Sequence, residues 1–144
     1  MISPDNISAI LHPMTVHFPI ALILTSAFLA VLYIVRKYSP IVNSTIRLLT
    51  VLCAVSAWAA VITGGFTPDY TGEINTVEGI HHIFAIITSV IITASAFFYL
   101  LSGMRITKGY YLLGWFGFSF LMLSVVTVSI TGYFGGYIVY NLLI

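Results

Sequence analysis

Four apolar stretches dominate this sequence, and each is long enough to cross a lipid bilayer as a helix. They cover residues 13–35, 46–64, 77–101 and 110–133. A hydrocarbon core of about 30 Å takes about 20 helical residues to cross, because each residue advances the helix by about 1.5 Å. Charged residues make up only 6% of the chain, too few to cover the surface of a soluble domain. The sequence therefore predicts an all-α integral membrane protein, a bundle of four transmembrane helices forming a single domain over residues 1–144.

The segments before the first span and after the last one carry their own signals. Ser3 and Pro4 predict the start of a short surface helix that ends near His12. Pro19 lacks the amide that would bond the carbonyl four residues back, so we expect the first spanning helix to bend there. The apolar tail after residue 133 is too short to cross the membrane again. We expect that tail to pack on the outer face of the bundle.

The charged residues divide cleanly between the two ends of the predicted bundle. The basic residues all lie beside the first and third loops: Arg36, Lys37, Arg47, Arg105 and Lys108. The acidic residues all lie at the opposite end: Asp5, Asp69, Glu73 and Glu78. Short loops that carry Lys and Arg tend to be retained in the cytoplasm. The sequence therefore predicts that both termini lie on the non-cytoplasmic side.

The four histidines fall at one level of the predicted bundle, near its outer surface. His12 and His17 lie at the outer end of the first helix, and His81 and His82 at the outer end of the third, which runs in the same direction. At 1.5 Å per residue, His17 lies about 6 Å and His81 about 8 Å inside its helix. Ionisable side chains in membrane segments are costly, so a pocket, a partner or a ligand is expected beside them.

Helix geometry favours one pair among these histidines. Neighbouring residues differ by about 100° around a helix, so one helix cannot aim both His81 and His82 at the same point. We favour His82 as the partner of His17, because it continues a seam of small residues further along the third helix. Glu78 precedes His81 by three residues and His82 by four, so its carboxylate can lie beside either imidazole.

The opening of the first helix resembles the signature of a prokaryotic membrane-protein family called domain of unknown function 2231. The residues that carry the resemblance are His12-Pro13-Met14-Thr15-Val16-His17-Phe18-Pro19-Ile20. Members of that family pair this motif with a glycine-containing second loop and a histidine that starts the third helix, as Gly64-Gly65 and His81 or His82 do here. Relatives occur fused to c-type cytochrome or Rieske-type modules. The resemblance therefore implies a multi-pass protein of the inner membrane, near extracytoplasmic electron transfer.

The first functional interpretation is a membrane electron-transfer protein or subunit. It would hold haem b, or a comparable redox centre, between the first and third helices near the extracytoplasmic surface. His17 and His82 would be the ligands of the iron, with His81 and His12 as the other candidates. Its partners would be the lipid bilayer and redox proteins such as c-type cytochromes. Against this interpretation, haem propionates would find no Lys or Arg at this acidic end.

Two alternatives stay open at this point. One is a zinc, copper or iron ion bound by His17 and His82 together with Glu78 or Asp69, since imidazole and carboxylate suit these ions. The other is a structural or assembly subunit of a larger membrane complex that has no cofactor of its own. In that case the histidines at the helix ends would bond backbone carbonyls, lipid headgroups or water.

Other functional classes fit the sequence less well. No proton-transfer group or open coordination position can be identified, so an accessory or electron-transfer role is favoured over an enzyme. A transporter would be expected to place ionisable residues at mid-bilayer depth, and the spans have none there. Five basic residues divided between two short loops make no surface that could bind nucleic acid.

Overall fold

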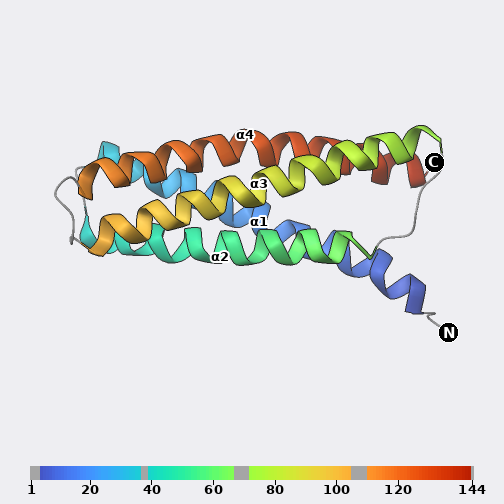
Figure 1. Ribbon diagram of the computed structural model, residues 1–144, viewed down its shortest axis with the longest axis horizontal. Helices are drawn as coiled ribbons and strands as arrows, with labels where there is room; N and C mark the ends of the chain where they lie inside the picture. The colour runs from blue at the N-terminus through green and yellow to red at the C-terminus, as the bar shows by residue number, and fades with distance from the viewer. Residues whose placement is uncertain (1–3, 37–38, 67–71, 105–109, 144) are drawn as a thin grey trace.

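Four long helices run side by side along the length of the molecule, as the computed structural model of the chain shows (Figure 1). The structure describes residues 4–36, 39–66, 72–104 and 110–143. The helices are α1 (Pro4–Val35), α2 (Pro40–Gly64), α3 (Glu73–Met104) and α4 (Tyr110–Leu143). Each is long and apolar enough to cross a membrane. The predicted all-α bundle of four transmembrane helices is confirmed.

Both termini lie at the same end of the bundle, which we call the terminal end (Figure 1). The end of α2 and the start of α3 lie there too, whereas the other end carries the end of α1, the start of α2, the end of α3 and the start of α4. We call the latter the loop end. Which of these ends faces the cytoplasm stays a prediction from the charges.

The helices extend beyond the apolar stretches that predicted them. The expected surface helix before residue 13 is continuous with the first span, and α1 passes through Pro13 and Pro19. Ser39 precedes the first helical residue of α2, Pro40, a position where the missing amide of proline costs nothing. The expected tail after residue 133 is the last part of α4. Hydropathy marks only the part of a helix that lies in hydrocarbon, and the helix itself continues into the interface.

The four helices pack as a ring of neighbours. The contact between α3 and α4 is the most extensive, followed by α1 with α2, α2 with α3, and α1 with α4. Therefore α1 and α3 face each other across one diagonal of the bundle. Between 28% and 33% of each span is buried within the bundle, so most of the apolar surface faces outward, where it suits lipid.

Small side chains let the helices approach closely in the interior. A side chain at Gly117 of α4 would place its Cβ 3.0 Å from the Tyr99 ring of α3. Ser95 is fully buried and donates a hydrogen bond to the Gly117 carbonyl at 2.8 Å. Other buried hydroxyls, such as those of Ser26 and Ser124, bond carbonyls of their own helices. The helices are therefore held together mainly by close van der Waals packing of small side chains, as expected for helices that associate within a membrane.

Candidate histidine site

Two histidine rings from diagonally opposite helices meet at the terminal end. The ring centres of His12 on α1 and His81 on α3 are 6.1 Å apart, and the ring planes are nearly perpendicular at 84°. Both side chains are half-buried. This ring contact joins α1 and α3 across the bundle.

His12 is held against α2 by a threonine and a glycine. Its Nδ1 lies 3.3 Å from the hydroxyl of Thr63, which in turn shares a 2.8 Å hydrogen bond with the hydroxyl of Thr15. The ring also lies within hydrogen-bonding reach of the Ala60 carbonyl. A Cβ at Gly64 would come within 2.9 Å of the His12 Cε1, so only glycine fits there without a shift of the ring.

His81 is held against α4 in the corresponding way. Its Nδ1 lies 2.9 Å from the backbone carbonyl of Thr131. A carbonyl oxygen only accepts, so Nδ1 carries the proton and the Nε2 of a neutral ring keeps its lone pair. A Cβ at Gly135 would lie 3.0 Å from the His81 Cε1, which again leaves little room for any larger residue. A histidine whose Nδ1–H is bonded to a carbonyl is oriented as a metal ligand usually is.

The other two histidines do not join this contact. The His17 side chain is exposed, and its Nδ1 bonds the Pro13 carbonyl one turn earlier in the same helix. His82 is partly buried beside His81, close enough for an electrostatic interaction with it. Among the described residues no hydrogen bond or ring contact joins His17 to His82. A cofactor bound by that favoured pair stays a prediction, and the geometry turns attention to His12 and His81.

The carboxylates expected nearby contribute in different ways. Glu78 is half-buried one turn before His81 and interacts with it electrostatically. Asp69 lies outside the described residues. Within the part of the chain that the structure describes, no group of three or more His, Cys, Asp or Glu side chains is placed to hold a metal ion. A metal bound by His12 and His81 would therefore take its remaining ligands from a moved side chain, water or another protein.

The separation of the two rings does not distinguish a single ion from a haem iron. A metal–nitrogen bond of about 2.0–2.1 Å places the centres of two imidazoles on one ion roughly 6 Å apart, whether that ion is free or in a porphyrin. The 6.1 Å found here is close to that value. Gly64 and Gly135 lie against the two rings, so the space beside the rings is small.

Comparison with known protein families identifies the family of the chain. The family model described as predicted membrane protein (DUF2231) matches residues 9–144. The chain belongs to this family. The family resemblance stated from the first-helix residues is therefore confirmed, and for this DUF2231 member the match extends through all four helices. Neither the curated proteins nor the solved structures that were compared include a match to it.

Proposed function

We propose that this DUF2231 member is a membrane electron-transfer subunit that binds a redox-active metal centre at the terminal end of its bundle. His12 and His81 would be the ligands from this chain. The observation that supports the proposal is the meeting of their rings, 6.1 Å between centres, from helices that otherwise lie across a diagonal. Imidazole binds copper and iron, which change charge by one electron.

The surroundings of the two rings suit this role. Thr131 fixes the orientation of His81, and Thr63 contacts His12, so neither ring depends on the metal for its position. His82 and Glu78 are the nearest further side chains on α3 that could complete the coordination. Haem b remains the larger alternative, with the same histidines as ligands after the helices separate.

The location of the site suits exchange of electrons with a second protein. Glu73 and Glu78 lie at the terminal end, and the charge distribution of the sequence predicts that this end faces away from the cytoplasm of a prokaryote. A soluble or anchored redox protein, such as a c-type cytochrome, could approach this end. A copper or iron ion held by His12 and His81 would supply one-electron redox chemistry between such a donor and an acceptor in the membrane.

A second candidate function is supported by a different observation. Each ring of the central pair already has a hydrogen-bond partner within the bundle. Among the described residues no buried side-chain nitrogen or oxygen is left without a partner. Histidines that are satisfied in this way can serve simply to tie helices together. That arrangement supports an accessory subunit of a larger membrane complex, without a cofactor of its own.

Metal analysis and absorption spectra of the purified protein separate these candidates. We expect iron or copper near one equivalent per chain, and a spectrum that changes when dithionite reduces the sample. His12→Ala and His81→Ala should each remove most of the metal. His17→Ala is the matched control, because that ring is exposed and bonds only its own helix.

Two results would decide against a metal centre. One is parent protein that contains neither metal nor haem after expression in cells supplied with both. The other is metal content that survives His12→Ala and His81→Ala while both variants keep their helical circular dichroism. Either result would favour the accessory subunit. A sharp haem spectrum in the parent protein that disappears in both variants would instead show that the bound group is haem b and not a single ion.

A further inference from the structure

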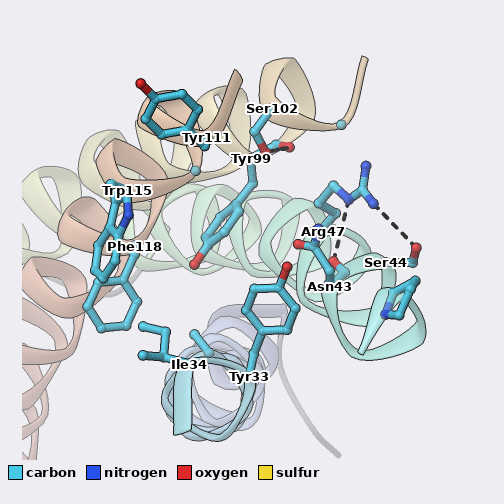
Figure 2. Close-up of a pocket in the computed structure, with 14 residues that line it drawn as sticks. Tyr33, Ile34, Asn43, Ser44, Arg47, Tyr99, Ser102, Tyr111, Trp115 and Phe118 are labelled. Carbon is cyan, nitrogen blue, oxygen red and sulfur yellow. Dashed lines mark hydrogen bonds between the residues drawn. The ribbon is translucent and has the colours of Figure 1, made fainter. Parts of the chain in front are cut away.

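A cavity of about 600 Å³ lies at the loop end, where all four helices contribute to its walls (Figure 2). Trp115 and Phe118 of α4 form an aromatic wall, and Tyr33 of α1 reaches in from below in this view. Tyr99 of α3 and Arg47 of α2 supply polar groups. The volume is in the range of small-molecule sites, and the walls have the mixture of apolar surface and few polar groups that such sites show.

Tyr99 supplies a hydroxyl that faces this cavity. The residue is 6% exposed, and its hydroxyl points into the space between α1 and α4 (Figure 2). A tyrosine hydroxyl can donate one hydrogen bond, so Tyr99 can donate to a molecule that occupies the cavity. A ligand that offers an acceptor oxygen at this point would accept that bond.

Arg47 supplies a positive charge at the rim of the cavity. Its guanidinium makes two long hydrogen bonds, to the Asn43 carbonyl and the Ser44 hydroxyl, each 3.4 Å (Figure 2). Residues 6–68 and 79–144 contain no Asp or Glu, so the chain has no carboxylate near this end. An anion that neutralises Arg47 must therefore come from outside the chain.

Both residues can reach the boundary between headgroups and hydrocarbon. At about 1.5 Å per residue, α2 is about 37 Å long and extends about 4 Å beyond each side of a hydrocarbon core of about 30 Å. The backbone of Arg47, about 10 Å from the start of α2, therefore lies about 6 Å inside the core, and a long arginine side chain can extend from there to the phosphate groups. Tyr99, about 8 Å from the end of the longer α3, lies close to the boundary itself, where a bilayer presents ester carbonyls.

From these observations we infer that the cavity binds one anionic phospholipid. Its phosphate bonds Arg47, an ester carbonyl accepts a hydrogen bond from Tyr99, and its acyl chains lie along Trp115 and Phe118 and continue into the bilayer. The acyl chains leave the cavity between α1 and α4, which have the least extensive contact of the four pairs of neighbouring helices. A neutral quinone would use the aromatic wall and the Tyr99 hydroxyl but would leave the charge of Arg47 without a partner.

Native mass spectrometry of the full chain in a mild detergent tests this inference. The probes are phosphatidylglycerol and phosphatidylcholine with identical acyl chains, and a short-chain quinone. We expect one phosphatidylglycerol per chain, bound at least about tenfold more tightly than phosphatidylcholine. Arg47 can form a charge-assisted hydrogen bond with the phosphate of phosphatidylglycerol, whereas the phosphate of phosphatidylcholine is already balanced by the positive charge of its choline group. The quinone should not displace it.

Variants of Arg47 and Tyr99 test whether these two residues cause the preference for phosphatidylglycerol. Arg47→Gln should reduce the preference for phosphatidylglycerol to about twofold or less, whereas Tyr99→Phe should weaken both lipids by about fivefold. Arg36→Gln is the matched control, because Arg36 is exposed at the same end and does not line the cavity. Gly103→Ala is a second test, since a Cβ there would clash with the Arg47 Nη1 and displace the guanidinium.

Two results with the parent protein would overturn the inference. One is equal binding of the two lipids, and the other is displacement of phosphatidylglycerol by the quinone. A preference that survives in both Arg47→Gln and Gly103→Ala would assign the lipid to another surface. If Arg47→Gln does not fold, as judged by circular dichroism, Gly103→Ala alone decides, because it keeps the charge and changes only its position.

Discussion

At the scale of single residues, the histidine pair depends on glycines that touch its rings. His81 is fixed by its bond to the Thr131 carbonyl, so the ring cannot easily move away from a new methyl group on Gly135. The next residue, Gly136, has open space around it, with nothing within 4 Å of a Cβ built there. Two adjacent glycines of one helix should therefore respond in opposite ways to the same substitution.

We predict that Gly135→Ala lowers the free energy of unfolding by about 1–3 kcal/mol, the usual cost of overpacking a well-packed interior. Gly136→Ala should be neutral or raise it by up to about 1 kcal/mol, because alanine favours the helix more than glycine does. Thermal unfolding followed by circular dichroism in detergent measures both. Equal effects of the two substitutions would show that His81 does not pack on Gly135 as described.

A seven-residue pattern in the sequence favours His81, although the small residues of the third helix favour His82. His81, Thr88, Ser95 and Ser102 follow one another at intervals of seven residues, the repeat that keeps one side of a helix against its neighbours. Thr88 and Ser95 are buried in the structure. The level of the histidines could be read from the sequence, but which rings meet depends on the rotation of α1 and α3, which packing alone sets.

At the scale of helices, α3 and α4 have the most extensive contact, and Gly117 of α4 packs against Tyr99 of α3 within it. The Tyr99 ring and its backbone nitrogen both lie within 3.2 Å of the position that a Gly117 Cβ would occupy. A backbone atom cannot turn aside as a side chain can. Any larger residue at Gly117 must therefore push the two helices apart.

Gly117→Ala should lower the unfolding temperature and the free energy of unfolding by about 1–3 kcal/mol. Gly132→Ala in the same helix is the control, because no atom lies within 4 Å of a Cβ at that site. Titration with a denaturing detergent, followed by circular dichroism, compares the two. A Gly117→Ala variant as stable as the control would mean that α3 and α4 approach less closely.

The existence of the helices was predictable, and their ends were not. Four helical spans followed from apolar length, because lipid requires every backbone group to be bonded internally and uninterrupted apolar stretches of about 20 residues suit helices and not the shorter strands of barrels. The continuation of α4 past Gly135 and Gly136 runs against the low helix propensity of glycine, and Gly135 lies against His81 there. The cavity at the loop end was also beyond sequence reasoning, because its walls come from all four helices.

At the scale of the whole molecule, the termini and the loops occupy opposite ends (Figure 1). Tags at the two termini should be reached by protease from outside intact cells. A maleimide that does not cross membranes should leave Ser44→Cys unlabelled until the cells are opened. The native Cys53 is fully buried within α2, so it adds no background. Labelling of Ser44→Cys from outside would reverse the orientation and place the histidines in the cytoplasm.

The contacts that hold α1 in the bundle are spread along most of its length. Polar contacts join His12 and Thr15 to Thr63, and Ser26 lies 3.5 Å from Cys53. Nearer the loop end, Ala30 is 1% exposed in the core and also lines the cavity. One continuous helix therefore connects the two sites, so substitutions that shift α1 at the histidine pair and substitutions that shift it at the cavity act on the same element.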